Sequence, residues 1–330
     1  MKITTPIEIK NTSFKNRVVM PPMCMYSVEK KDGVITDFHY THYLTRAYGG
    51  VGTIILESTA IMPNGRISNE DLGLWNEEQK EALKPLVELI KKQQTVVGIQ
   101  INHAGRKARV DEETWGPSAI AFNQLKRPKE MSKDEINESI TSFGKAAKRA
   151  LEAGFDLLEI HAAHGYLINQ FLSPLTNHRT DEYQEKTLYL KQVIQEIKKY
   201  WPEDKILQIR ISAEEYDSKG LHPENLAQII NEIKDLGIDI VNVSTGGVIY
   251  KKINDYPGYQ IPAAKIIKEK TNLMVIAGGL IDTINEGNKY LEENQLDFIY
   301  YGRKLLRDPY FLYKETDIEW PKQYIRAKLK

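Results

Sequence analysis

The residues best suited to chemistry lie in one stretch, "IHAAHGYLINQFLSP", which runs from Ile160 to Pro174. It carries His161 and His164, three positions apart, and Tyr166 two positions later. Imidazole N–H groups can polarise a carbonyl or similar oxygen, and a tyrosine can hand over a proton. Imidazole is also the commonest protein ligand for zinc. The stretch therefore predicts an oxyanion-binding site or a metal site, unless the two histidines merely begin a helix.

Eight short apolar runs supply the elements that would position these side chains. Their unbroken hydrophobicity is typical of strands that are covered on both faces, as in parallel sheets. Helical patterns separate several of them, at residues 76–94, 132–154, 188–202, 225–237 and 261–272. The runs cover residues 17–22, 52–58, 95–102, 155–161, 205–212, 238–245, 272–279 and 296–303.

Eight strands alternating with helices predict a (β/α)8 TIM barrel, an α/β fold, in a single domain over residues 1–330. The rival is a doubly wound open sheet, which predicts a glycine-rich turn after the first strand. That strand is followed instead by "PPMCMYSV". We therefore favour the barrel.

The amino-acid composition of the chain limits the classes of partner that it is expected to bind. The chain has 45 basic and 45 acidic residues in 330, so nucleic acid or an anionic membrane surface is not expected as its main partner. No segment approaches the roughly 20 apolar residues of a membrane span. The single cysteine, Cys24, suits a reducing compartment, which predicts a cytoplasmic protein that acts on small molecules.

Chemistry in a TIM barrel lies at the carboxyl ends of the strands. The seventh strand ends in "AGG", with Gly278 and Gly279, and the eighth in "YGR", with Gly302 and Arg303. Glycines allow the backbone to approach an anion closely, and arginine adds a charge-assisted contact. These two ends predict a site for a phosphate-bearing ligand.

The remaining strand ends supply few metal ligands and few side chains that could act as a nucleophile. Metal-dependent hydrolase barrels usually supply further ligands on the first and last strands, which here end in "MCMY" and "GR". Cys24 is the one evident nucleophile, and it would need a base to activate it. We therefore expect no metal, and a phosphate-bearing cofactor that carries the difficult chemistry.

At this point a family resemblance becomes apparent. "PPMCMYSV", "GRI", "QINHAGRKA", "EIHAAHGYLINQFLSPLTNHRTDEY", "AGG" and "YGRKLLRDPYF" resemble the Old Yellow Enzyme family of FMN-dependent ene-reductases. The bacterial branch known as NADPH dehydrogenase is the most similar, and the resemblance runs from about Pro6 to Arg326.

The resemblance implies bound FMN with NADPH as reductant. Gln100 and Arg210 would contact the pyrimidine edge of the flavin, and the glycines with Arg303 would hold its phosphate. Ser58 stands where this branch more often has alanine. The implied cofactor-binding residues are Pro21, Pro22, Met23, Cys24, Ser58, Gln100, Arg210, Gly278, Gly279, Gly302 and Arg303.

The resemblance also implies a ping-pong reduction of the activated C=C bond of α,β-unsaturated carbonyl compounds. NADPH would give a hydride to flavin N5, which would pass it to the β-carbon of a substrate held by His161 and His164. Tyr166 would protonate the α-carbon, and Tyr26 and Lys107 would line the substrate site. Nitro compounds and quinones could present an oxygen to the same histidines.

Near the carboxyl terminus, a tail over about residues 315–330 is expected at a subunit interface of a homodimer or homotetramer. Arg326 occupies the place from which this branch sends an arginine into the neighbouring subunit's substrate site, although "AK" follows it here instead of Gly-Trp. A non-catalytic flavin-dependent sensor on the same scaffold is the competing interpretation. That alternative does not require Tyr166.

Overall fold

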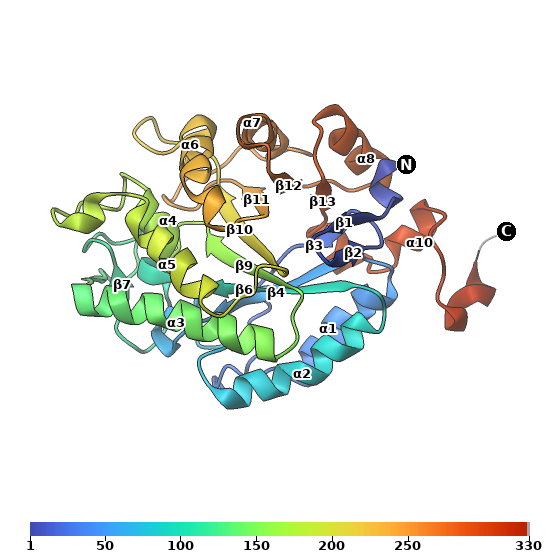
Figure 1. The fold of residues 1–330 in the computed structure, drawn as a ribbon, viewed down its shortest axis with the longest axis horizontal. Helices are drawn as coiled ribbons and strands as arrows, with labels where there is room; N and C mark the ends of the chain where they lie inside the picture. Colours follow the sequence, from blue (N-terminus) through green and yellow to red (C-terminus); the bar gives the residue numbers. More distant parts are fainter. Residues whose placement is uncertain (329–330) are drawn as a thin grey trace.

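The eight apolar runs form eight parallel strands that close into a barrel in the computed structural model, which describes residues 1–328 (Figure 1). The first strand pairs with both the second and the last, so no edge is left within the ring. The strands are β3 (Val18–Met20), β4 (Thr53–Ala60), β6 (Val96–Asn102), β9 (Leu157–Ala162), β10 (Ile206–Ser212), β11 (Ile240–Ser244), β12 (Met274–Ala277) and β13 (Phe298–Tyr300).

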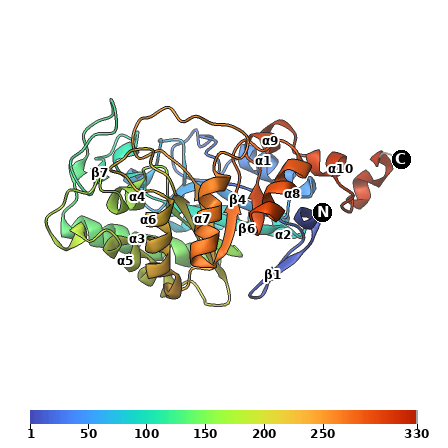
Figure 2. The ribbon, with the colours of Figure 1, turned by 90° about the horizontal axis from the view of Figure 1, so that it is seen from above.

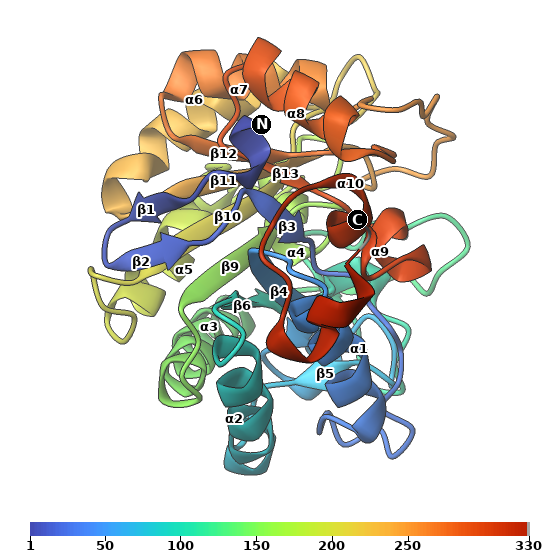
Figure 3. The same ribbon diagram turned by 90° about the vertical axis from the view of Figure 1, so that its right-hand side faces the viewer.

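Helices surround the strands in the views along and across the barrel (Figures 1 and 3). Every residue of β4, β6, β9, β10 and β11 is buried, because one face of each strand points inward and the other is covered by helices. The helices are α1 (Asp37–Tyr48), α2 (Glu77–Lys91), α3 (Lys133–Glu152), α4 (Leu167–Leu172), α5 (Leu188–Lys198), α6 (Pro223–Ile233), α7 (Ile261–Thr271), α8 (Ile284–Glu293), α9 (Arg303–Arg307) and α10 (Phe311–Glu315).

The predicted TIM barrel is confirmed, and the five predicted helical segments correspond to α2, α3, α5, α6 and α7. The helices α1, α4, α8, α9 and α10 were not predicted. In α8, "INEGNKYLEE" contains a glycine, which lowers helix propensity. Gly287 leaves room there for the Tyr301 hydroxyl, which an added Cβ would overlap.

A hairpin of β1 (Ile7–Ile9) and β2 (Thr12–Phe14) covers the amino-terminal end of the barrel. Phe14 packs edge-on against Phe298 of β13, with ring centroids 5.1 Å apart, inside a cluster of apolar residues from the strand starts. In Figure 2 the dark-blue hairpin lies at the opposite edge of the molecule from the long loops. This end of the barrel is therefore sealed, and the carboxyl ends of the strands carry the site.

Two segments leave the regular alternation. The loop after β6 holds only a 3-10 turn (Gly105–Lys107) and two short strands, β7 (Trp115–Gly116) and β8 (Lys129–Glu130). The tail after α10 ends in a 3-10 segment, Lys322–Ala327, and extends along one side of the molecule (Figure 1). Within residues 1–328, no helix is both long and apolar enough to cross a membrane.

Candidate active site

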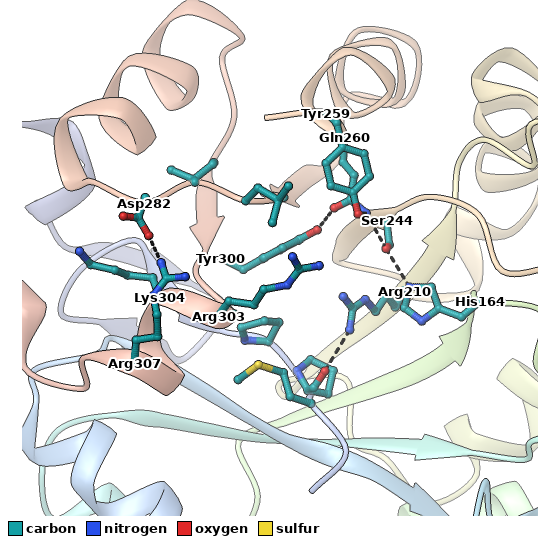
Figure 4. A pocket seen from close by; sticks show the side chains of 17 residues that line it. His164, Arg210, Ser244, Tyr259, Gln260, Asp282, Tyr300, Arg303, Lys304 and Arg307 are labelled. Atoms are coloured by element: carbon teal, nitrogen blue, oxygen red, sulfur yellow. Dashed lines mark hydrogen bonds and ion pairs between the residues drawn. The ribbon is translucent and has the colours of Figure 1, made fainter. Parts of the chain in front are cut away.

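The carboxyl ends of the strands surround a cavity of about 590 Å³. Small-molecule sites usually measure roughly 300–1,000 Å³. Figure 4 shows Arg210 and Arg303 extending into it from opposite sides, with the Tyr300 ring beside Arg303. Of the residues predicted from the sequence, Pro21, Pro22, Met23, His164, Arg210, Gly279, Gly302 and Arg303 line this cavity.

Arg210 lies at the end of β10 with part of its donor capacity unused. Its Nη1 donates to the carbonyl oxygen of Pro22 at 3.4 Å, and its guanidinium lies 5.7 Å from the centre of the Tyr300 ring. Its Nε is buried and has no hydrogen-bond partner within residues 1–328. A buried donor of this kind is costly unless a ligand satisfies it.

Two of the glycines predicted to hold a phosphate, Gly278 and Gly279, could not carry a side chain without strain, whereas a Cβ on Gly302 would make only ordinary contacts. A Cβ added to Gly278 would lie 2.5 Å from the Tyr300 ring and 2.6 Å from its carbonyl oxygen, and Gly279 has φ +105°. Gly302 directly precedes Arg303, whose exposed side chain forms no ion pair with any residue in the described part of the chain. A close backbone approach and a free guanidinium suit a phosphate.

His161 is neutral and has a defined free donor. Burial is the main reason that its pKa lies well below the ordinary value, and the nearby His164, Arg210 and Lys107 lower it further. Its Nδ1 accepts a hydrogen bond from the Ala163 N–H at 3.3 Å. The proton of the neutral ring is therefore on Nε2, which is free to donate to a ligand.

His164 is held in a left-handed backbone conformation, with φ +58°. Its N–H donates to the Ser212 hydroxyl at 2.8 Å, and its carbonyl oxygen accepts from Lys107 at 2.8 Å. Its Nε2 lies 2.8 Å from the Ser244 hydroxyl, which also accepts from Gln260. The Ser244 hydrogen can be donated to Nε2, and a neutral ring that accepts there is protonated at Nδ1. Burial holds the pKa of His164 well below its ordinary value.

Tyr166 stands against the histidine pair. Its ring centroid lies 4.9 Å from that of His161 and 6.5 Å from that of His164, in edge-on arrangements. Burial raises its pKa well above the usual range, and Cys24, Tyr26 and Asp71 add to the rise. The hydroxyl therefore stays protonated at neutral pH, as a proton donor requires.

Cys24 and Tyr26 follow β3 and belong to the same side of the site. Cys24 packs with Tyr166 against an apolar cluster, and burial raises its pKa, so it remains a thiol. Tyr26 has φ +52° and is half exposed, and burial of the rest of its side chain raises its pKa to about 12. A protonated thiol is a poor nucleophile, so the structure argues against attack by Cys24.

Lys107 joins three loops at the mouth. Its Nζ donates to the carbonyl oxygens of His164 and Gly247, at 2.8 and 3.0 Å, and lies 5.2 Å from the centre of the Tyr166 ring. Burial, aided by Arg106 and Arg109, lowers its pKa to about 8. Lys107 thus fixes the loop after β9 to the loop after β11.

Two predicted residues lie deeper in the barrel, and one lies outside the site. Ser58 and Gln100 are register partners on β4 and β6, and both are buried. Arg326 is exposed in the tail and does not line the cavity of its own chain. Within residues 1–328, no group of three metal-ligating side chains lies close enough together to hold an ion.

Several residues of the cavity were not among those predicted from the sequence. Ser244 ends β11 and could be noticed as a polar strand end, and Tyr300 directly precedes the tyrosine of the "YGR" motif. Tyr259 and Gln260 come from an irregular segment before α7 that carries no distinctive pattern. Ser212 could be noticed only as the last residue of its strand.

Comparison with known proteins identifies the family to which this site belongs. The model of the NADH:flavin oxidoreductase / NADH oxidase family, an FMN oxidoreductase family, matches residues 2–317. The chain belongs to this family. Among curated relatives, the NADPH dehydrogenase of Clostridium acetobutylicum is 50% identical over 99% of both chains, and that of Bacillus subtilis is 44% identical over 99% of both.

Solved structures in the same fold class support the barrel of this flavin oxidoreductase. Morphinone reductase superposes with a TM-score of 0.82 at 23% identity, over 94% of this chain and 87% of its own. A 2-naphthoyl-CoA reductase complex gives a TM-score of 0.88 at 23% identity, over 94% of this chain and 51% of its own. At this level of identity the likeness concerns the fold alone.

The cavity of this flavin oxidoreductase fits FMN on independent grounds. The unpartnered Nε of Arg210 offers a donor for the isoalloxazine, and Gly279, Gly302 and Arg303, which line the same cavity, offer a cradle for the phosphate. The predicted Old Yellow Enzyme resemblance, with FMN as cofactor of an oxidoreductase, is confirmed by the family match and the full-length relatives.

Proposed function

We propose that this flavin oxidoreductase is an NADPH-dependent ene-reductase that reduces the activated C=C bond of α,β-unsaturated carbonyl compounds. The observation that carries the proposal is the pair of neutral histidines with free N–H donors beside a protonated tyrosine. The full-length NADPH dehydrogenases among its relatives support NADPH as the reductant. Nitro compounds and quinones belong to the same proposed range, because they present an oxygen to the same donors.

The chain's own residues would bind the substrate and supply the proton. FMN, when bound, accepts a hydride from NADPH and delivers it to the substrate. Nε2–H of His161 and Nδ1–H of His164 hold the substrate oxygen, and they stabilise the negative charge that grows there in the transition state. Tyr166 gives its hydroxyl proton to the α-carbon and regains a proton from water. NADPH and the enone use this site in turn, so the kinetics are ping-pong.

The tail provides a further part of the proposal. Arg326 is exposed and away from the cavity of its own chain, so in a homodimer or homotetramer it would reach the substrate site of a neighbour. An Arg326→Ala variant should then raise the KM for the enone without changing the rate of flavin reduction. Unchanged saturation by the enone would contradict this role.

An anaerobic absorbance titration tests the proposed activity. NADPH should bleach the flavin bands of the purified protein, and 2-cyclohexenone should restore them. Bleaching without reoxidation would make the protein a flavin reductase with a different acceptor. A protein that takes up no FMN would contradict the proposal altogether.

A further inference from the structure

A layer of polar side chains fills the barrel just below the mouth. Gln100, Glu159, Gln208 and Asn242 come from the four neighbouring strands β6, β9, β10 and β11, and all are at most 2% exposed. TIM-barrel interiors are usually filled by branched apolar side chains. Side chains two residues further along a strand point the same way. Directly above this layer are therefore three residues of the site, His161, Arg210 and Ser244.

Glu159 is the centre of this layer. Its Oε1 accepts from Gln100 Nε2 at 2.7 Å, and its Oε2 accepts from Asn242 Nδ2 at 2.7 Å and from Gln208 Nε2. The carbonyl oxygens of Gln208 and Asn242 are buried and have no partner within residues 1–328. An ionised carboxylate can only accept hydrogen bonds, so all three amides turn their NH2 groups toward Glu159. Gln208 and Asn242 do so even though their own carbonyl oxygens are left unpaired.

A carboxylate at this depth is not explained by stability. Burial raises the pKa of Glu159, while Arg210 and the three amides oppose that rise. Buried ionic groups are often no more stabilising than well-packed apolar residues of similar volume. The apolar cluster at the other end of the same barrel shows that this chain fills its interior without charge where no site lies above.

We propose that Glu159 is a positioning residue of the cofactor site. Its carboxylate turns the Gln100 amide so that the carbonyl oxygen is offered to the N3–H group of the flavin, and its charge opposes that of Arg210. The inference rests on the proposed function and on the contact of Gln100 with the pyrimidine edge of the flavin that the family resemblance implies. Because the NH2 group of Gln100 is committed to Glu159, its oxygen is the free acceptor, and no residue in the described part of the chain donates to it.

The variant Glu159→Gln tests this role in the holoenzyme. A carboxylate can only accept, but the new amide can present either its oxygen or its NH2 group, so the orientation of the Gln100 amide is no longer fixed and its NH2 group can turn toward the flavin N–H. Dissociation of oxidised FMN, followed by flavin fluorescence, should show a Kd about tenfold higher. Without the carboxylate that opposes the charge of Arg210, the affinity for reduced flavin should rise about tenfold relative to the affinity for oxidised flavin. The two-electron midpoint potential should therefore rise by about 30 mV.

Two further variants separate positioning from stability. Asp239→Asn makes the same change at the sealed end, where Asp239 accepts from Leu207 N–H and from Lys10, and it should leave both readouts unchanged. The double variant Glu159→Gln with Gln208→Glu moves the carboxylate to the register partner on β10. The new amide can then donate to it and still accept from Gln100, so the Kd and the potential should return toward wild type. A Glu159→Gln protein that loses stability but keeps the wild-type Kd and potential would overturn the proposal.

A test on the unmodified chain remains decisive if Glu159→Gln does not fold. FMN methylated at N3 lacks the donor that Gln100 is proposed to meet, so the wild type should bind it at least about tenfold more weakly than FMN. Equal binding of the two flavins would overturn the inference while leaving the proposed ene-reductase intact. Failure to bind FMN at all would instead count against the proposed function.

Discussion

The residues after β9 and those after β12 and β13 meet at one cavity, but they are held in different ways. His164 is fixed through its backbone N–H, its carbonyl oxygen and its ring, by Ser212, Lys107 and Ser244 respectively. Arg303, on the opposite side, is exposed and forms no ion pair within residues 1–328. One side is assembled before any ligand arrives, whereas the other offers an open cradle.

The difference follows from what each side would have to do. Donors that stabilise charge in a transition state are effective only when they are oriented in advance, because reorganisation during the reaction would cost part of the gain. A phosphate is a fixed part of the cofactor, so its binding energy can order the groups around it. The strained backbone of His164, with φ +58°, is the cost of that advance orientation.

The largest expected effect is chemical and lies on the assembled side. Tyr166→Phe removes the proposed proton donor but keeps the ring that packs against His161. Reoxidation of reduced flavin by 2-cyclohexenone should slow by about 100-fold or more, since general acid catalysis is worth roughly 10²–10⁴-fold. Flavin reduction by NADPH should be unchanged. Stopped-flow measurement of both half-reactions checks this, and equal slowing of the two would show that Tyr166 acts on binding instead.

Removing the hydrogen bonds that Lys107 donates to the loops after β9 and β11 should have the next largest effect. Lys15 offers a matched control. Lys107→Met removes the donors to the carbonyl oxygens of His164 and Gly247, and kcat/KM for the enone should fall about tenfold. Lys15 at the sealed end is likewise half-buried, donates to the Gln93 carbonyl oxygen, and has its pKa lowered by burial to about 8.

Lys15→Met should therefore cost stability without changing turnover. Each variant should lower the free energy of unfolding by about 1–3 kcal/mol, measured with urea. Loss of turnover in both variants, in proportion to lost stability, would show that Lys107 acts only through folding.

On the open side, single changes should affect cofactor retention and not the chemical step. Arg303→Met should raise the Kd for FMN about tenfold, because one charge-assisted contact to the phosphate is lost. Arg307 lines the same cavity but is paired with Asp282, so Arg307→Met should raise the Kd by less. Fluorescence titration gives both constants. An equal effect of the two arginines would mean that general charge, not a specific contact, holds the phosphate.

The smallest expected effect is that of pH on the KM for the enone, because the two histidines stay neutral. Their pKa values are lowered by burial well below 6.5, so both rings stay neutral as the pH falls from 8 to 6, and the KM for a neutral enone should stay flat. Stability should behave differently. The unfolded chain takes up protons at these histidines below about pH 6.5 while the native state does not, so this contribution to stability falls with falling pH. A break in KM near pH 6.5 would contradict the neutral rings.

Much of the fold could be predicted from the sequence because each barrel strand is covered on both faces, which favours continuous apolar runs such as Val18–Met20. The pairing of His161 with Tyr166 could be predicted because both are local to one strand end. The tautomer of His164, by contrast, depends on Ser244, which is 80 residues away from it. No local pattern specifies such a contact.

By itself, the sequence determined eight strands, a polar rim at their carboxyl ends and the residue types gathered there, because periodicity and strand-end position are local properties. Only the tertiary structure decided which donors remain free, that Lys107 and Ser212 hold the His164 backbone, and that Glu159 gathers three amides inside the barrel. The physical reason is that hydrogen-bond partners and burial arise from strands distant in the chain, and they exist only once the barrel has closed.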